Sequence, residues 1–131
     1  AKVVSLSEAA SLAIHAVVLI AQSDKLINVN QIAEATAASR NHLAKVMQRL
    51  AKQGIVVSSR GPNGGFKLNG DPKDFSLYKI YECIEGPIEL EGCPLDREIC
   101  PFEKCLMGGI IHRVTNDLKT YLLEDTVDRY I

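Results

Sequence analysis

The sequence predicts a mainly α-helical fold that carries one small β-hairpin. Apolar residues recur three and four positions apart in several segments, and cap-forming residues precede some of these segments. Two short segments rich in β-forming residues flank a Gly-Pro-Asn-Gly-Gly turn. Because three helices lead directly into this hairpin, the order of elements predicts a winged helix-turn-helix with a further helical part behind it.

Three helices are expected before the hairpin. The first spans residues 6–22, and a polar turn and a short extended piece follow it. Asn30 is expected to cap a short second helix at 31–35, and Ser39 to cap the third after a turn at 36–38. Two short helices around a tight turn are typical of a helix-turn-helix.

The third helix has an apolar stripe and leads into the hairpin. Gly54 ends this helix, and residues 55–60 and 66–69 are the two expected strands around the turn at 61–65. Four residues at i, i+3, i+4 and i+7 form the stripe that should face the core: Leu43, Val46, Met47 and Leu50.

Composition limits the class of protein. The chain has 131 residues, 47% apolar and 24% charged, as in one soluble domain with or without a helical extension. This excludes a disordered tail and a multidomain enzyme.

The longest apolar run, 12–21, reaches about half the length of a membrane span. A capping-box spacing at 5–8 favours a stable helix over a signal peptide, so we expect a cytoplasmic protein with no membrane partner.

Charge is distributed unevenly along the chain. The formal net charge is −1, from 15 basic and 16 acidic side chains. Residues 1–70 nevertheless carry eight Lys or Arg and three Asp or Glu, whereas residues 71–131 carry seven basic and thirteen acidic side chains. An asymmetry of this size indicates two surfaces with different partners.

The basic half is predicted to bind a double-stranded DNA operator. From Arg40 to Lys67 there are six basic residues and no Asp or Glu, and phosphate neutralisation explains a surface of one sign. The third helix would enter the major groove, and the hairpin would lie on the backbone or in the adjacent minor groove. The alternatives are an idle basic surface or a winged helix that binds protein. The candidate DNA contacts are Ser39, Arg40, Asn41, His42, Lys45, Arg49, Arg60, Asn63 and Lys67.

The chain is expected to divide at residue 70 into a DNA-binding part, 1–70, and a second part, 71–131. The second part should contain a connecting helix at 75–85, an aperiodic loop at 86–107 and a final helix at 108–131. The final helix has little of its own domain left to pack on, so it favours dimerisation. The alternative is that it folds back onto the first helix.

Three cysteines, Cys93, Cys100 and Cys105, crowd into the loop. Their thiolates can converge on one metal centre, and cysteine followed by proline recurs in iron-sulfur ligand runs. The acidic residues around them disfavour a nucleophilic role, whereas a bound cationic centre stabilises thiolates. Structural zinc sites usually have shorter gaps, so the spacing favours an iron-sulfur cluster over zinc or a thiol switch. Cys83 is expected to be a small apolar core residue.

The cluster needs a fourth ligand, and the first helix offers candidates on a polar stripe of Glu8, Ser11, His15 and Gln22. In the plainer interpretation this stripe is only the solvent face. In the other interpretation His15, or less favourably Glu8, completes the cluster from a partner subunit. His112 and Glu103 are weaker candidates.

These features together resemble the Rrf2 family of bacterial winged-helix regulators, which includes IscR and NsrR. The matching stretches are 12–16, 32–34 and 42–46 in the helices, 60–68 in the wing, and the three cysteines before the final helix. The resemblance covers essentially the whole chain. It implies a homodimer crossed through the C-terminal helices, an imperfect palindromic operator, and an iron-sulfur cluster held by the three cysteines.

The resemblance also bears on the type of cluster. Members with clusters commonly have two gaps of five residues between cysteines, whereas this chain has gaps of six and four. Gly108 stands where some members with a 2Fe-2S cluster have a histidine, so a 4Fe-4S or a 2Fe-2S cluster stays open. In other members the remaining ligand comes from the first helix of the partner chain, and one such histidine aligns with His15.

The sequence therefore predicts a transcriptional regulator, most often a repressor in this family, that senses redox state, iron-sulfur status or nitric oxide. Cluster binding would order residues 88–107 and fix the angle between two winged helices. One alternative is a cluster-free regulator whose cysteines form reversible disulfides. Another is a small iron-sulfur electron carrier, for which the basic surface has no use. Enzyme chemistry on a small-molecule substrate is not expected, because no phosphate loop, acid-base pair or activated nucleophile is found.

Overall fold

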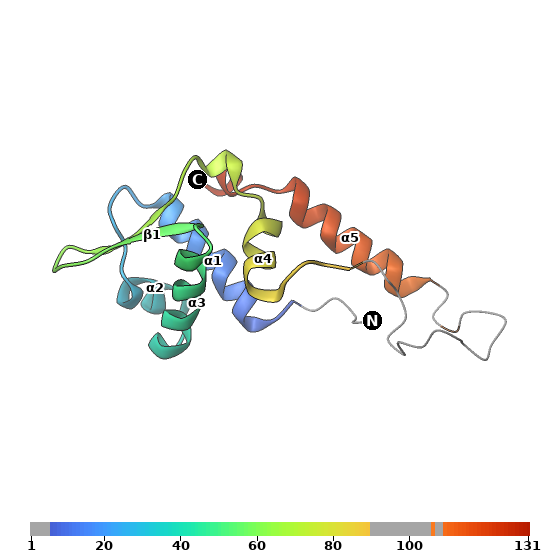
Figure 1. Ribbon diagram of the computed structural model, residues 1–131, viewed down its shortest axis with the longest axis horizontal. Coiled ribbons are helices and arrows are strands. Elements are labelled where there is room, and N and C mark those ends of the chain that lie inside the picture. The colour runs from blue at the N-terminus through green and yellow to red at the C-terminus, as the bar shows by residue number, and fades with distance from the viewer. Residues whose placement is uncertain (1–5, 90–105, 107–108) are drawn as a thin grey trace.

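The computed structural model describes residues 6–89, 106 and 109–131. Figure 1 places α1 to α4 and the hairpin together, with α5 running away from them along the long axis of the molecule. The predicted mainly α fold with a winged helix-turn-helix is confirmed. The elements in chain order are α1 (Glu8–Gln22), α2 (Val29–Thr36), α3 (Arg40–Lys52), β1 (Val56–Ser59), β2 (Gly65–Leu68), the 3-10 helix η1 (Pro72–Asp74), α4 (Leu77–Glu85), α5 (Ile110–Glu124) and the 3-10 helix η2 (Val127–Tyr130).

The helix α1 lies at the centre of the core. Its neighbours in the described part of the chain are α4, α3, α2, β2 and η2. Three of the six buried residues of α1 are alanines, whose small side chains let neighbouring helices approach closely. The buried residues of α1 are Ala10, Leu12, Ala13, Ala16, Val17 and Ile20.

The expected start of α1 was two residues early. Ser7 is the N-cap, and its side chain accepts a hydrogen bond from the amide of Ala10 at 3.0 Å. The same hydroxyl donates to the carboxylate of Glu85 at the end of α4. This contact between two helices gives Ser7 a tertiary partner as well as a capping role.

The predicted cap of the second helix was also wrong by two residues. Asn28, not Asn30, is the N-cap of α2, and it forms a capping box with Gln31 through two hydrogen bonds of 2.9 Å. The preceding residue, Ile27, pairs with Phe66 of β2, whose amide donates to the Ile27 carbonyl at 2.8 Å. The extended piece before α2 is therefore tied to the hairpin.

The turn between α2 and α3 and the start of α3 follow the prediction. Ala37 adopts the left-handed conformation, with φ 57° and ψ 29°, and closes α2. Ser39 caps α3 by accepting from the amide of His42 at 3.2 Å. The predicted apolar stripe is confirmed, because its four residues are all buried: Leu43, Val46, Met47 and Leu50.

The hairpin is antiparallel and is anchored at its base. Val56 pairs with Leu68 in the core, whereas Val57 pairs with Lys67 on an exposed face. The side-chain amide of Asn69 donates to the carbonyl of Gly54 at 2.9 Å and closes the base. Figure 1 shows the far end of the hairpin projecting from the domain.

The second part of the chain differs from the prediction in its final helix. α4 buries Leu77, Ile80, Tyr81 and Ile84, the apolar face of the expected connecting helix. α5 packs against α4, and not against α1 as the alternative to dimerisation supposed. The helix expected at 108–131 ends at Glu124, and it begins at Ile110. In the described residues, no helix has the length and apolar character needed to cross a membrane. The predicted loop at 86–107 lies largely outside the described residues.

Residues 125–131 return across the domain after α5 ends. Thr126 pairs with Ser76, which precedes α4, in an isolated antiparallel bridge. The side-chain amide of Gln22, at the end of α1, donates to the carbonyl of Tyr130 at 2.7 Å. This segment therefore joins the start of α4 to the end of α1.

Asp125 holds the start of this segment. Its side chain is only 4% exposed, and its carboxylate accepts hydrogen bonds from the Tyr130 hydroxyl and, at 3.0 Å, from the Arg129 guanidinium. Its backbone carbonyl accepts from the amide of Leu77 at 2.9 Å. Burial alone would raise the pKa of the Asp125 carboxyl, but the hydrogen bonds outweigh burial and hold that pKa below its ordinary value. The carboxylate is therefore charged at neutral pH.

The left-handed conformation of Ala37 gives a test of the helix-turn-helix geometry. Because a Cβ atom disfavours this conformation, Ala37→Gly should raise the free energy of unfolding by about 0.5–1 kcal/mol. Urea unfolding followed by circular dichroism measures the change. Ala38→Gly, one residue further on, is the control and should lower stability, because its φ is not positive. Destabilisation by Ala37→Gly would contradict the turn geometry.

Candidate nucleic-acid interface and α1 hollow

The exposed side of α3 carries the predicted DNA contacts. The core stripe occupies one side of this helix, so Arg40, Asn41, Lys45 and Arg49 fall on the solvent side, where all four are exposed. His42 is half-buried, and Ser39 is exposed while its hydroxyl caps the helix. The structure therefore places the polar residues of α3 where a groove of DNA could reach them.

The wing places its predicted contacts on the same half of the molecule. Arg60 follows β1, Asn63 lies in the turn and Lys67 lies on the outer face of β2, and all three are exposed. A hollow of about 410 Å³ separates the wing from the start of α2, and Asn28, Ser59 and Arg60 are among its lining residues. Backbone contact between Ile27 and Phe66 sets the distance between these two elements.

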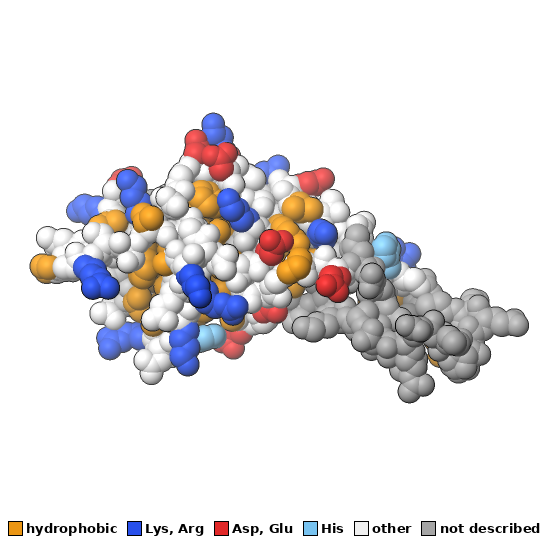
Figure 2. Space-filling view, viewed as in Figure 1, with side chains coloured by type: hydrophobic (Ala, Val, Ile, Leu, Met, Phe, Trp, Pro, Cys, Tyr) orange, Lys and Arg blue, Asp and Glu red, His pale blue; other side chains and the backbone are white. Residues whose placement is uncertain are grey.

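Charge on this half of the molecule is predominantly positive. Figure 2 shows Lys and Arg side chains prevailing over the left of the face, around α3 and the wing, and Asp and Glu side chains over the top and centre. The ion pairs Lys73–Asp71 and Arg129–Asp125 lie in η1 and after α5, away from α3 and the wing. The acid-free stretch 40–67 thus forms one basic surface, which we call the α3–wing surface.

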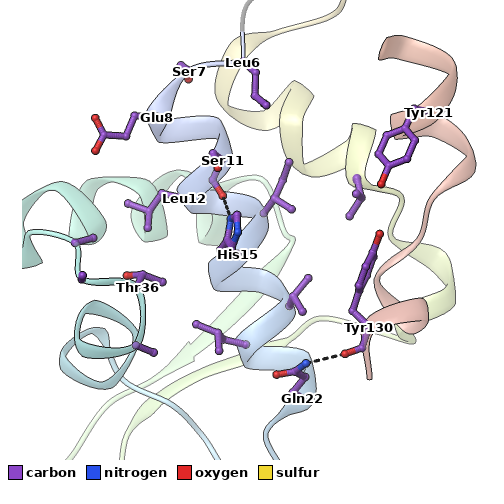
Figure 3. A pocket seen from close by; sticks show the side chains of 17 residues that line it. Leu6, Ser7, Glu8, Ser11, Leu12, His15, Gln22, Thr36, Tyr121 and Tyr130 are labelled. Atoms are coloured by element: carbon purple, nitrogen blue, oxygen red, sulfur yellow. Dashed lines mark hydrogen bonds between the residues drawn. The ribbon is translucent and has the colours of Figure 1, made fainter. Parts of the chain in front are cut away.

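The polar stripe predicted on α1 lines an open hollow of about 1030 Å³. Figure 3 shows the stripe along one side of this hollow and the rings of Tyr121 and Tyr130 on the other. The Nδ1 atom of His15 lies 2.7 Å from the carbonyl oxygen of Ser11, and the imidazole is exposed. If Nδ1 carries the proton, Nε2 keeps its lone pair and can bind a metal.

The predicted cluster cysteines, Cys93, Cys100 and Cys105, lie outside the described residues, as does Glu103. Within the ranges that are described, no group of three or more His, Cys, Asp or Glu side chains could hold a metal ion. Cys83 is half-buried, and its Sγ lies 3.6 Å from the carbonyl oxygen of Arg49. Burial raises the pKa of the Cys83 thiol, so this cysteine matches the expected core residue better than a ligand.

The sequence did not reveal several residues around these sites. Tyr121 and Tyr130 line the α1 hollow, but they were assigned no role there because nothing in the sequence places them opposite α1. The pairing of Ile27 with Phe66 was missed for the same reason. Asn-Gly turns and helix caps are local signals, whereas these contacts join positions that are far apart in the chain.

A helix-turn-helix and a wing that share one core and one basic surface define a winged-helix DNA-binding protein. A family model described as "Rrf2: Iron-dependent Transcriptional regulator" matches residues 6–130. The chain belongs to the Rrf2 family of transcriptional regulators.

Similar proteins agree with this assignment. An HTH-type transcriptional regulator of Aquifex aeolicus is 34% identical over 76% of this chain and 68% of its own length. The HTH-type transcriptional regulator NsrR of Bacillus subtilis is 32% identical over 81% of this chain and 70% of its own length. These relatives are named as regulators and not as enzymes.

Solved structures share the fold. The global cysteine regulator CymR of B. subtilis superposes with a TM-score of 0.78 at 21% identity, over 95% of this chain and 94% of its own. T. potens IscR superposes with a TM-score of 0.74 at 22% identity, over 95% of this chain and 84% of its own.

The position of the wing depends on a close backbone approach. A Cβ atom on Gly65 would lie 2.7 Å from the carbonyl oxygen of Ile27, so Gly65→Ala must push the hairpin away from the start of α2. We expect a loss of about 1–3 kcal/mol in the free energy of unfolding, measured by urea denaturation. Lys67→Ala, on the exposed face of the same strand, is the control and should change stability by less than about 0.5 kcal/mol. Equal stability of the two variants would be inconsistent with this contact.

Proposed function

We propose that the protein is an iron-sulfur-dependent transcriptional regulator that binds a double-stranded DNA operator as a homodimer in the cytoplasm. The observation that carries the DNA-binding part is the α3–wing surface, which is exposed, basic and free of carboxylates from residue 40 to 67. The description of the matching family as iron-dependent supports the metal. Repression is the expected mode of action.

Each element of the α3–wing surface has a proposed role on DNA. The start of α3 enters the major groove, where Arg40, Asn41 and Lys45 reach base edges or phosphates. Arg60 and Lys67 neutralise phosphates beside the wing. The further proposed contacts are Ser39, His42, Arg49 and Asn63.

Two substitutions on α3 test the DNA surface. Arg40→Ala and Lys45→Ala should each weaken binding and lower the slope of log Kd against log salt by about one, because each removes a phosphate contact. Fluorescence anisotropy with a labelled duplex, selected by the wild-type protein from a random library, measures both quantities.

Lys73→Ala is the matched control for the loss of one charge. Lys73 lies in η1 and its side chain is 71% exposed, so its removal changes net charge without touching α3 or the wing. If all three variants change the salt slope equally, α3 does not contact the phosphates.

The outward side of α5 supports a homodimer. Val114 lies one helical turn after Ile110, and Tyr121 lies two turns after Val114, so the three side chains project from one side of α5. Their exposed fractions are 39%, 49% and 56%, respectively. Leu122, about 100° further around the helix from Tyr121, is buried, and α4 is the helix against which α5 packs. A second copy crossing α5 would remove this apolar stripe from water, as the resemblance implies.

The proposed cluster ligands are Cys93, Cys100, Cys105 and His15. The donor set fits iron-sulfur chemistry, because soft thiolates and a neutral imidazole are ligands that iron clusters accept. His15 also satisfies the usual orientation of a metal-binding histidine, in which the other ring nitrogen bonds a carbonyl oxygen, here that of Ser11 at 2.7 Å. When bound, the cluster would supply a centre that reacts with oxidants or nitric oxide. Iron and sulfide analysis distinguishes a 4Fe-4S from a 2Fe-2S cluster.

Anaerobic purification tests the cluster. The wild-type protein should bind iron and sulfide and absorb light through sulfur-to-iron charge transfer, and Cys93→Ala, Cys100→Ala and Cys105→Ala should each abolish this absorption. His15→Ala should lower cluster retention by about 10–100-fold or change the spectrum, whereas His112→Ala, an exposed histidine of α5, should not. An iron-free, colourless wild-type protein would remove the cluster from the proposal.

A cluster-free thiol-redox regulator is the second candidate. One of the structures with the same fold is an oxidised form of Staphylococcus aureus CymR, with a TM-score of 0.73 at 19% identity. The same three cysteines would then form reversible disulfides. Alkylation followed by mass measurement, before and after oxidation with diamide, distinguishes this chemistry from cluster binding.

A further inference from the structure

The chain that leads into residues 93–105, which we call the cysteine segment, is held by two helices at Ile88. Ile88 is buried and lies five residues before Cys93 in the sequence. Its amide donates a hydrogen bond to the phenol oxygen of Tyr78 on α4 at 3.1 Å. Its carbonyl oxygen accepts from the ammonium group of Lys119 on α5 at 3.3 Å. Both backbone polar groups of one buried residue are therefore satisfied by side chains from two helices.

The two side chains also contact each other. The Nζ atom of Lys119 lies 5.7 Å from the centroid of the Tyr78 ring, within the range of a cation–π contact. Burial raises the pKa of the Tyr78 phenol, so the phenol is neutral at physiological pH. We call Tyr78, Ile88 and Lys119 the Ile88 clamp.

The helix α4 connects this clamp to the α3–wing surface. α4 packs against α1 and α3 on one side and against α5 on the other. Cys83, five residues after Tyr78, places its Sγ 3.6 Å from the carbonyl oxygen of Arg49 in α3. A shift of α4 must therefore change its contacts with α3, because packed helices move as units.

Partial loosening of the Ile88 clamp costs free energy. Buried amide and carbonyl groups lose free energy when they lose their partners, so Ile88 either stays in the clamp or leaves it entirely for water. A contact of this kind favours two discrete arrangements, formed or fully released, over intermediate ones, which is what a switch requires.

We infer that Tyr78 and Lys119 are positioning residues that transmit the chemical state of the cysteine segment to α3 through α4. This inference rests on the proposed function, since it concerns how loading or oxidation of the cysteines changes DNA binding. The metal-free, reduced cysteine segment leaves Ile88 in the clamp, and loading or oxidation of the cysteines releases it. The clamp thereby couples two sites that share no residue.

The test compares DNA binding in two chemical states of the full chain. Each protein is prepared anaerobically, once reconstituted with Fe²⁺ and sulfide and once stripped of metal and kept reduced. The Kd for a duplex selected by the wild-type protein is measured in both states, and the ratio of the two values reports the coupling. Tyr78→Phe removes the acceptor for the Ile88 amide, and Lys119→Met removes the donor to its carbonyl oxygen.

In Tyr78→Phe and in Lys119→Met, the Kd values of the two states should differ by a factor at least about five times smaller than in the wild-type protein. Lys119→Arg keeps a cationic donor and should restore the wild-type ratio. Lys79→Met is the matched control, because Lys79 on α4 also lies over an aromatic ring, 4.8 Å from the centroid of Phe75, and carries the same charge. It should leave the ratio unchanged.

Amide hydrogen exchange in the metal-free protein provides a readout that does not depend on cluster loading. The amide of Ile88 should exchange slowly in the wild-type protein and in Lys79→Met, and at least tenfold faster in Tyr78→Phe. Unchanged exchange in Tyr78→Phe would overturn the clamp itself.

The remaining outcomes separate the two proposals. If the Kd of the wild-type protein differs between the two states and the Kd of each clamp variant differs by the same factor, the inference is overturned and the proposed function stands. A wild-type protein with the same Kd in every state, including after oxidation with diamide, overturns both. If Lys79→Met brings the ratio of Kd values as far toward one as Lys119→Met does, the effect comes from the loss of charge and the inference fails.

Discussion

Close contact between α1 and α4 determines where every other element of the domain lies. It is possible because α1 presents Ala10, Ala13 and Ala16, which have no exposed surface, to its neighbours. A larger side chain at any of these positions would have to displace a packed helix. α4 in turn packs against both α3 and α5, so the α3–wing surface and the helix that follows the cysteine segment share one support.

Residues 125–131 reinforce this contact from outside the helix pair. The segment adds a bridge at the start of α4, a hydrogen bond at the end of α1 and a fully buried Val127 between them. The charged carboxylate of Asp125 keeps the segment in place because its partners replace the water that burial removes. The end of α5 nearest residues 125–131 is therefore firmly attached to the winged helix, while Lys119 attaches the same helix to Ile88, ahead of the cysteine segment.

Local signals in the sequence were sufficient for most of the winged helix. The stripe on α3, its cap at Ser39 and the hairpin turn could be predicted because each depends on residues less than about ten positions apart. The caps at Ser7 and Asn28 were misplaced because a chemically similar residue stands two positions away in each case. Contacts with Glu85 and with the wing select the true cap, and such contacts join distant positions. The Ile88 clamp, which joins three separate segments, had no signal at all. Cys93, Cys100 and Cys105 lie outside the described residues, so their role stays a prediction from spacing and resemblance.

The two sides of α3 are made from separate sets of residues, and this separation affects how the protein can change over generations. Leu43, Val46, Met47 and Leu50 are the buried residues that bind the helix to the core. Exposed positions such as Asn41 and Lys45 take no part in that packing, so mutations there change the free energy of unfolding very little. After gene duplication, two copies could therefore diverge to control different sets of genes while keeping the same scaffold.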